Sequence, residues 1–253
     1  MNKLSDKNIE NLRICGKILS KSLKEAAAAI KPGISASEID RIAEKSLRKN
    51  GASPSFLNYQ SHGSYPFPNS ICLSINNEVV HGIPKKDKII KEGDIVGIDI
   101  GAEYKGIYCD MAETRVVGRE KSKKDLKLVS VTKEALNEGI KKAVAGNTTG
   151  DIGSRIQKYV ESHGFSVVRS LVGHGIGRGP HLDPQVPNFG RPGEGEKLEN
   201  KTAIAIEPMT VAGDYQISTS SDGWTVLTAD GTNSAHFEHT ILINNNKPEI
   251  ITK

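Results

Sequence analysis

The sequence predicts an α+β protein in which two similar halves close into a single domain, and three observations lead to this expectation. The chain has 253 residues, of which 36% are hydrophobic and 25% are charged, as is typical of a globular protein with a sizeable core. Two helices followed by several strands are expected twice in succession. The second copy follows the first at an offset of 113 residues, which aligns Gly33 with Gly146 and Gly51 with Gly164.

This duplication divides one domain, 1–253, into halves of about 1–119 and 120–253. The alternative is that an ordinary α/β chain shows the same order of elements twice by chance. Duplicated halves would be related by a pseudo-twofold axis. A ligand site would then be expected in the cleft between them.

Two helices begin the first half. Apolar residues recur at three- and four-residue steps over 7–31, which predicts an amphipathic helix that ends at the following Pro-Gly pair. Ser35 and Glu38 have the spacing of a capping box, so a second helix is expected over 36–50.

The remainder of the first half is expected to be a loop and short strands. Residues 52–70 are rich in Pro, Ser, Gly and aromatic residues, which indicates an irregular loop. Short apolar runs then predict strands at 71–76, 79–81, 94–101, 106–111 and 114–118.

The second half repeats this order. A third helix is expected over 122–145, with an apolar face made by Leu126, Val129, Leu136, Ile140, Ala143 and Val144. After a short link, a fourth helix over 151–163 ends at Gly164. Strands are expected at 165–172, 202–208, 224–228 and 236–244.

Composition argues against several classes of protein. The net charge of +4 is too small to indicate nucleic-acid binding by itself. The three cysteines, Cys15, Cys72 and Cys109, form no CxxC pair, which argues against a disulfide framework and against a zinc finger. No apolar run reaches the roughly 18 residues that a membrane span requires. The polar N-terminus and the few cysteines suggest a cytoplasmic protein.

Asp99 and Asp110 are the first candidate functional residues, because each lies within an apolar strand pattern. If the connecting turn is centred between Tyr104 and Lys105, the two aspartates face each other directly, and their carboxylates could hold a pair of metal ions. A turn centred between Lys105 and Gly106 is the rival. We expect such a one-residue shift to place the aspartates on opposite faces of the sheet. Solvated aspartates on an edge strand are the other interpretation.

Two glutamates and a histidine extend this set. Glu207 ends one apolar strand, and Glu238 lies at the beginning of another. His174 lies in the glycine-rich stretch 173–181, for which a flexible surface turn is the alternative. Four carboxylates and one imidazole suit Mn, Fe(II), Co or Zn in a dinuclear site. The sequence contains neither HExxH nor GxSxG, which argues against an ordinary zincin and against an α/β-hydrolase.

Six stretches distributed over nearly the whole chain carry a family resemblance: 77–84, 93–99, 109–110, 173–181, 206–209 and 236–240. In order and in residue type they resemble the type I methionine aminopeptidases in their short bacterial form. The resemblance implies the pita-bread fold, a pseudo-twofold α+β domain with a curved antiparallel sheet backed by helices. It also implies a metalloprotease of the aminopeptidase class. Such an enzyme removes the initiator methionine from nascent proteins and peptides, preferably before a small second residue.

The resemblance assigns metal ligands at matching positions. Two divalent metal ions would be held by Asp99, Asp110, His174, Glu207 and Glu238, with Asp110 and Glu238 bridging them. A metal-bridging hydroxide would attack the first peptide bond. Glu207 also matches the residue that moves the proton of the attacking water.

The resemblance further assigns residues that contact the substrate. His81 and His181 match the histidines that contact the scissile peptide and stabilise the tetrahedral intermediate. Phe67, Cys72 and Trp224 lie where the family places its methionine pocket, with core packing as the alternative. The sequence departs from the family in its proline-rich stretch 65–69 and at Pro180, where an aromatic residue is frequent. These departures concern the lining of the pocket and leave the metal ligands unaffected.

Two other functions are alternatives to a methionine aminopeptidase. The related prolidases and aminopeptidases P share the five ligands but usually carry an additional N-terminal domain. A non-enzymatic module that binds peptides or RNA would have lost ligands, whereas all five are present. We expect a monomer that acts on a peptide or a nascent chain, with no membrane and no specific DNA. Weak docking to a ribosome through the basic stretches 85–88 and 121–124 is a hypothesis, beside the simpler interpretation of solvated lysines.

Overall fold

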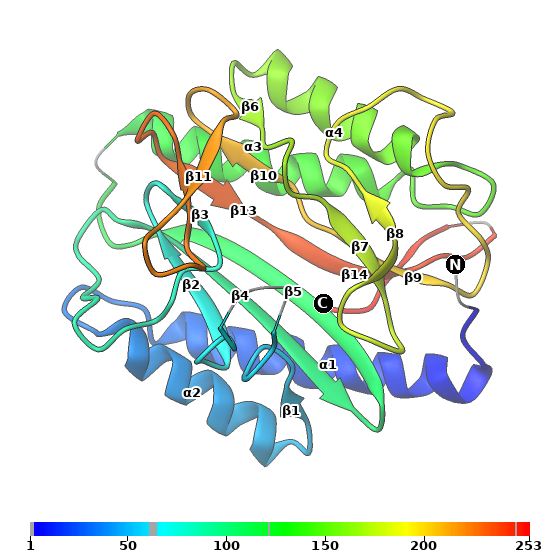
Figure 1. Ribbon diagram of the computed structural model, residues 1–253, viewed down its shortest axis with the longest axis horizontal. Coiled ribbons are helices and arrows are strands. Elements are labelled where there is room, and N and C mark those ends of the chain that lie inside the picture. Colours follow the sequence, from blue (N-terminus) through cyan, green and yellow to red (C-terminus); the bar gives the residue numbers. More distant parts are fainter. Residues whose placement is uncertain (1–2, 61–64, 121, 246) are drawn as a thin grey trace.

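The computed structural model describes residues 3–60, 65–120, 122–245 and 247–253 (Figure 1). The helices within these ranges are α1 (Asp6–Ala28), α2 (Ala36–Lys49), α3 (Lys123–Ile140) and α4 (Thr149–Ser162). The strands of the first half are β1 (Ser53–Pro54), β2 (Ile71–Ile75), β3 (Glu78–Val80), β4 (Ile95–Tyr104) and β5 (Ile107–Val116). Those of the second half are β6 (Ser166–Val167), β7 (Gly173–Ile176), β8 (Leu182–Val186), β9 (Ala203–Ile206), β10 (Met209–Val211), β11 (Ile217–Thr219), β12 (Val226–Thr228), β13 (Ser234–His236), β14 (Glu238–Leu242) and β15 (Glu249–Ile250).

An antiparallel sheet, here called the central sheet, joins the two halves. Within the described residues its strands follow the order β1-β4-β5-β14-β9-β7-β8, with β2 beside β4 and β15 beside β14. Figure 1 shows α1 and α2 along one side of the molecule and α3 and α4 along the opposite side. Strands β5 and β14 pair with each other, so the central sheet is continuous between the halves.

Each helix pair covers its own hydrophobic core. The first core packs the apolar face of α1, including Leu12 and Leu19, against β4 and β5. The second packs α3 and α4 against residues of β9 and β14 such as Ile204 and Ile241. Side chains alternate along a strand, so apolar residues such as Ile98 on β4 enter the core while their neighbours along the strand point to the other face. This alternation gives the central sheet an apolar face under the helices and a face on which polar groups can gather.

The α3 helix differs from its prediction. Leu126, expected inside, is 44% exposed, while Leu128, Val131 and Ala135 are buried. The helix begins after Ser122, whose side chain accepts from the backbone N–H of Asp125, and it ends at Ile140 rather than at 145. The prediction was therefore wrong for Leu126. Leu136, Ile140 and Ala143 of the expected apolar face are buried, and Val129 packs against the second core.

Strand positions differ in three places. The runs expected at 106–111 and 114–118 form one continuous strand, β5. Of the strand expected at 165–172, the structure has the two residues of β6, followed by β7 from Gly173. The loop expected over 52–70 contains the short β1 strand.

The turn between β4 and β5 corrects the expected register. Lys105 and Gly106 form the turn with φ of 51° and 76°, as in the two-residue hairpin turns that need positive φ. Asp99 therefore faces Ala112, and the prediction that it faces Asp110 directly was wrong. Moving the turn centre by one residue shifts the pairing by two, so both aspartates stay on the same face, contrary to our second expectation. They are diagonal neighbours, which long or charged side chains can still bridge.

The helix ends of the two halves correspond closely. Ser35 with Glu38 begins α2 through a capping box, and Thr148 with Asp151 begins α4 in the same manner. The aligned glycines also share a left-handed backbone, with φ of 91° at Gly33 and 97° at Gly146. The division into halves at about residue 119 stays a prediction. Among the described residues, no helix has both the length and the apolar character needed to cross a membrane.

Candidate metal centre

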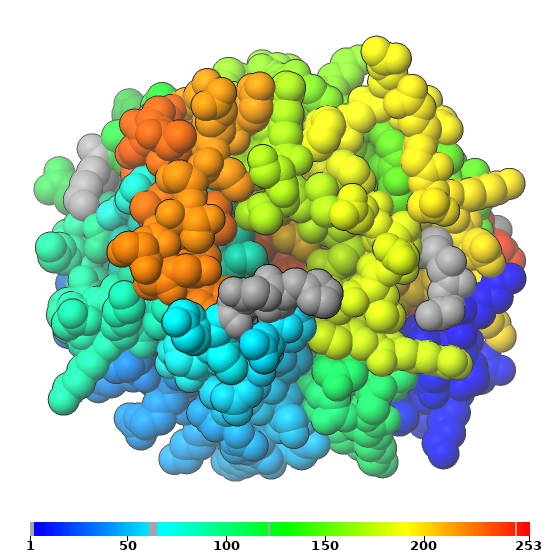
Figure 2. Space-filling model, in the orientation of Figure 1, coloured from blue at the N-terminus to red at the C-terminus, as the bar shows by residue number. Residues whose placement is uncertain are grey.

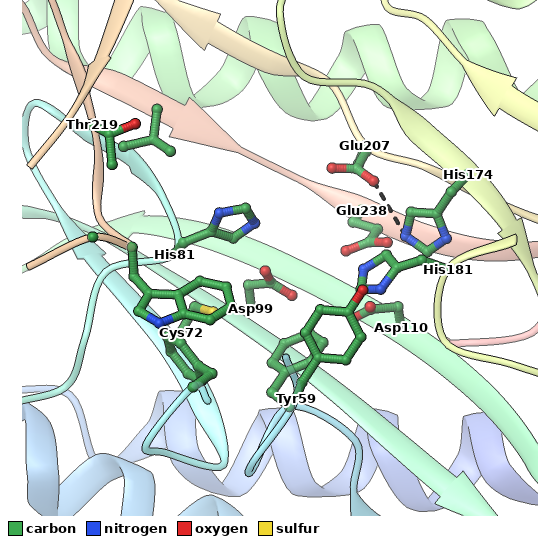
Figure 3. Close-up of a pocket in the computed structure, with 15 residues that line it drawn as sticks. Tyr59, Cys72, His81, Asp99, Asp110, His174, His181, Glu207, Thr219 and Glu238 are labelled. Carbon is green, nitrogen blue, oxygen red and sulfur yellow. Dashed lines mark ion pairs between the residues drawn. The ribbon is translucent and has the colours of Figure 1, made fainter. Parts of the chain in front are cut away.

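The seven polar residues proposed from the sequence line one cavity of about 320 Å³. Figure 2 shows a hollow where this cavity opens to the surface, between the orange segment around β11 and β12 and the yellow-green segment around β7 and β8. In Figure 3 the carboxylates and imidazoles point toward one another from several strands. The cavity is lined by Phe56, Tyr59, Phe67, Cys72, His81, Asp99, Asp110, His174, His181, Glu207, Thr219, Gly223, Trp224, Val226 and Glu238.

Strand pairing brings the candidate ligands together. Glu238, the first residue of β14, faces Ala112 on β5. Glu238 is therefore a diagonal neighbour of Asp110, which lies two residues before Ala112 on the same strand. On its other side β14 pairs with β9, and Glu207 directly follows β9. His174 lies on β7, which also pairs with β9. Neighbouring strands of the central sheet thus contribute side chains that are far apart in the sequence.

Three overlapping groups of side chains could each hold a metal ion. Within each group the ligand atoms lie within 4.8 Å of one another, in the part of the chain that the structure describes. Asp110, His174 and Glu238 each belong to two of the groups. The groups are Asp99, Asp110 and Glu238; His174, Glu207 and Glu238; and Asp110, His174 and His181.

Buried carboxylate oxygens of this cavity include two, among the described residues, that no protein group stabilises. Asp110 is 3% exposed and Glu238 2% exposed. Oδ1 of Asp99 and Oε1 of Glu238 are buried without a hydrogen-bond partner among the described residues. A buried carboxylate is costly unless a cation or a hydrogen bond compensates it. The chemistry of this donor set therefore fits one or more divalent cations.

The pKa shifts of the carboxyl groups also favour a cation site. Burial raises the pKa of Asp99 to about 7. Burial, together with the charge of neighbouring carboxylates, raises the pKa of Asp110, Glu207 and Glu238 well above the usual range. Like charges at close range disfavour simultaneous ionisation, and a bound cation would reverse this effect.

The imidazole of His174 is oriented for metal binding. Its Nδ1–H donates to the carbonyl of Gly175 at 3.0 Å, which leaves the lone pair of Nε2 free on the cavity side. Nε2 lies 3.5 Å from Oε1 of Glu207 (Figure 3). Burial, followed by the charge of His181, lowers the pKa of His174 to about 3, so the ring is neutral, as a ligand must be.

The two other predicted histidines border the same cavity. His81 directly follows β3 and has a left-handed backbone, with φ of 59°, a conformation that is uncommon for residues other than glycine. The ring centroid of His181 lies 4.5 Å from that of His174. Burial lowers the pKa of both, to about 4 for His81. Both rings are therefore neutral at physiological pH and can each donate one N–H.

An apolar slot forms the other wall of the cavity. Phe67 is 2% exposed and Cys72 4% exposed, and both belong to one hydrophobic cluster with Phe56, against which Trp224 packs. The Phe67 and Trp224 rings meet edge to face at 5.2 Å, and the indole N–H donates to the carbonyl of Tyr65 at 3.0 Å. The three predicted pocket residues thus lie together, while Pro180 is outside the cavity lining.

Sequence reasoning missed several residues of this cavity. Phe56 and Tyr59 lie in the stretch expected to be an irregular loop, and the Tyr59 ring lies 4.8 Å from that of His181. Thr219 and Val226 come from the small β11-β12 sheet. Nothing in their local sequence distinguishes them from ordinary loop or core residues. Residues 61–64, which directly precede the proline-rich departure at 65–69, lie outside the described residues.

The metal-free protein should lose stability as the pH rises from about 6.5 to about 8.5. In this window the unfolded carboxyls are ionised, whereas in the folded site Asp99 has a pKa of about 7 and the pKa values of the three other carboxyls are raised well above their usual range. The folded state then binds more protons, so the free energy of unfolding falls as the pH rises. Below about pH 6.5 the site histidines act in the opposite direction, because their pKa values are lowered.

Urea unfolding at pH 6.5, 7.5 and 8.5 in a chelator measures this dependence. With saturating Mn²⁺ the trend should reverse, because metal ligands must be deprotonated to bind. A metal-free stability that rises over this window would contradict the assignment of the buried carboxyls.

Comparisons with known proteins identify the family of the chain. Residues 10–245 match the model of metallopeptidase family M24. The chain is 48% identical over 248 residues to a methionine aminopeptidase of Clostridium acetobutylicum, covering 98% of this chain and 97% of that protein. A crystal structure of methionine aminopeptidase from Thermotoga maritima superposes with a TM-score of 0.95 at 43% identity, covering 100% of this chain and 99% of the other.

A prolidase from Pyrococcus furiosus shares the fold at a greater distance. It matches with a TM-score of 0.78 and 22% identity, and the match covers 99% of this chain but 65% of the prolidase. The expected pita-bread fold, α+β with a mainly antiparallel sheet, is confirmed by these neighbours. The chain belongs to metallopeptidase family M24, and it matches the methionine aminopeptidases of that family over almost its whole length.

Proposed function

We propose that this chain is a metal-dependent aminopeptidase that removes the N-terminal methionine from proteins and peptides, preferably where the second residue is small. One observation carries the proposal: a cluster of carboxylates and neutral imidazoles shares a single cavity with an apolar slot. The cluster supplies hydrolytic chemistry, and the slot supplies selectivity for one side chain. The names of the relatives, at 40–48% identity, support the same reaction.

Two divalent metal ions are proposed for the site. Asp110, His174 and Glu238 each belong to two of the three overlapping groups, and the resemblance assigns the bridging positions to Asp110 and Glu238. Asp99 would complete the first position, and His174 with Glu207 the second. When bound, such ions provide a water nucleophile at neutral pH and polarise the carbonyl of the substrate. The carboxylate-rich donor set with one imidazole suits Mn, Fe(II), Co or Zn.

The residues of the chain then divide the remaining tasks. Glu207 would take the proton of the attacking water and pass it to the leaving amine, for which a raised pKa is suitable. His81 and His181 would donate N–H groups to the substrate peptide and to the negative charge that develops on its carbonyl oxygen. Their neutral state and their position beside the candidate ligands support these roles.

The slot made by Phe67, Cys72 and Trp224 is proposed to hold the methionine side chain. An unbranched thioether packs well against aromatic edges and a thiol. The edge-to-face contact of Phe67 with Trp224 forms one wall, and His81 adjoins it, its ring centroid 6.3 Å from that of Trp224.

Trp224→Ala should lower kcat/KM for Met-Ala peptides by about 10–100-fold, because a lost contact of 1.5–3 kcal/mol corresponds to such a factor. The loss should be smaller for peptides with a small first residue, which do not fill the slot. Steady-state kinetics on both peptide types measure this difference. Tyr215→Ala is the matched control, since Tyr215 is a partly exposed aromatic residue outside the cavity lining. Equal losses on both peptides would contradict the assignment of the slot.

The prolidase reaction is the rival within the same fold, and one experiment separates the two. The metal-free protein is titrated separately with Co²⁺, Mn²⁺, Fe²⁺ and Zn²⁺ and assayed on a Met-Ala peptide and on an Xaa-Pro peptide. Release of methionine from the first, with no action on the second, is the expected result. Cleavage of the Xaa-Pro peptide alone would reverse the assignment. No activity, together with no metal binding, would favour a non-enzymatic module.

The localisation, the oligomeric state and the partners of the enzyme are also proposals. We propose a cytoplasmic monomer that acts on peptides and nascent chains. Weak ribosome docking is less well supported, because Lys88 is engaged with Glu78 and with the carbonyl of Leu73, and Lys85 lies 3.7 Å from Asp222. The second basic stretch, 121–124, begins at a residue outside the described part of the chain. Salt-dependent co-sedimentation with ribosomes tests the docking.

A further inference from the structure

His236 is a buried residue for which neither the sequence nor the resemblance suggests a role. It ends β13 and is 5% exposed. Its Nε2 has no hydrogen-bond partner among the described residues, and this atom lies 3.9 Å from Oε2 of Glu207. A buried polar atom without a partner is unfavourable for folding and requires an explanation, of which a role in function is one.

The backbone on both sides of this contact is fixed. The hydroxyl of Thr114 accepts from the backbone N–H of His236 at 3.0 Å and donates to its carbonyl at 2.7 Å. Strand β13 pairs with β10 so that His236 faces Met209, two residues beyond Glu207. The side chain of Asn188 donates to the carbonyl of Glu207 at 3.0 Å. The imidazole and the carboxylate are therefore held beside each other by the surrounding strands.

The two oxygens of Glu207 face different imidazoles. Oε1 lies 3.5 Å from His174, which is a candidate metal ligand. Oε2 lies toward His236, which belongs to none of the metal-binding groups found in the described residues. His236 is thus placed to act on Oε2 of the carboxylate, whereas His174 lies near Oε1.

We propose that His236 is a positioning residue whose Nε2–H donates to Oε2 of Glu207 and fixes the orientation of that carboxylate. The inference rests on the proposed function, because it assigns Glu207 to metal binding and proton transfer. One bridging water, or a small rotation of the carboxylate, spans the 3.9 Å between the two atoms. Partners of this kind hold metal-ligating carboxylates in a single orientation, and their loss weakens metal affinity or activity.

The test compares three substitutions that differ in where they place an N–H group. His236→Leu removes the donor and retains apolar bulk. His236→Gln places an amide nitrogen near the position of Nε2, and His236→Asn places one near Nδ1 instead. For each full-length variant we would measure kcat and KM on a Met-Ala peptide at saturating Mn²⁺, the Kd for Mn²⁺ by titration calorimetry, and the Tm of the metal-free protein.

The Leu and Asn variants should lose about 10–100-fold in kcat, with a weaker affinity for Mn²⁺ and little change in KM, since the apolar slot is untouched. His236→Gln should restore both quantities. The metal-free Leu variant should melt at the native temperature or above it, because the contact of Nε2 with Oε2 of Glu207, 3.9 Å long, contributes little to the stability of the metal-free fold. A purely structural role would instead lower its Tm.

Unchanged kcat and Mn²⁺ affinity in His236→Leu would overturn the proposal, as would equal behaviour of the Gln and Asn variants. If His236→Leu does not fold, the comparison of Gln with Asn still decides. If the native protein releases no methionine with any metal, the proposed function fails. The calorimetric comparison of the variants with Mn²⁺ alone would then still test whether His236 positions Glu207.

Discussion

Asp110→Asn should abolish tight metal binding and slow methionine release by at least about 1000-fold, because a bound metal ion supplies several kcal/mol of stabilisation to the transition state. Asp110 is 3% exposed and belongs to two of the three groups that could hold an ion. The amide retains an oxygen for the hydrogen bond from the backbone N–H of Met111, which is 2.9 Å long in the native protein. The substitution therefore removes a charge and leaves the local backbone in place.

Thermal stability shows whether the lost activity of Asp110→Asn reflects lost metal binding or a destabilised fold. Without metal, Asp110→Asn should melt above the native protein, because one of four mutually repelling carboxylates is gone. The rise in Tm that Mn²⁺ produces in the native protein should disappear. Asp87→Asn is the matched control, since Asp87 is exposed and lies outside the cavity lining. A variant that binds Mn²⁺ as tightly as the native protein would contradict the role of Asp110.

The elements that were predicted well carry their signal within a few residues. The capping box of Ser35 with Glu38 begins α2 where expected, and the glycines Gly33 and Gly51 have the positive φ that ends a helix or permits a tight turn. Such signals depend on the local backbone and on one or two side chains. They survive in any tertiary context, so a single sequence is sufficient to read them.

The errors arise where a choice depends on contacts that are distant in sequence. The strands beneath α3 decide which of its apolar residues are buried, so Leu126 was assigned wrongly although Leu136 and Ile140 of the same predicted face are buried. The β4-β5 register depends on whether Lys105 adopts a positive φ, which sequence alone did not decide. Both alternatives nevertheless place Asp99 and Asp110 on one face, so the error in register did not remove the carboxylate pair.

The candidate site was predictable in its ionisable residues but not in its surroundings. Carboxylates inside apolar strands are unusual, and this made Asp99 and Asp110 conspicuous. Tyr59 and His236 carry no such signal. Tyr59 lies in a loop, and His236 begins the stretch 236–240 without belonging to the expected ligand set. Their proximity to the cavity follows from strand pairing and loop packing, which only the folded chain displays.

Glu207→Gln should lower kcat by about 10²–10⁴-fold at saturating metal, which is the usual contribution of a positioned proton acceptor. The amide is similar in size and keeps one oxygen for a metal ion, but it cannot accept and return a proton. Oε1 and Oε2 lie 3.5 Å and 3.9 Å from the two flanking imidazoles, so the side chain is already confined to the position from which a proton would be moved. KM for a Met-Ala peptide should change little, because the apolar slot is intact.

The decisive comparison sets this variant beside Asp110→Asn at equal metal content. If Glu207 acts only as a ligand, activity in Glu207→Gln should return as Mn²⁺ is raised to saturation. If it also moves the proton, turnover should remain low when calorimetry shows the metal sites filled. Raised pKa values of Asp110 and Glu207 both follow first from burial, so pH dependence alone does not distinguish them. Comparing the loss of turnover with the loss of bound metal distinguishes the two residues. Only the substitution of a residue that moves the proton lowers turnover while the metal sites stay filled.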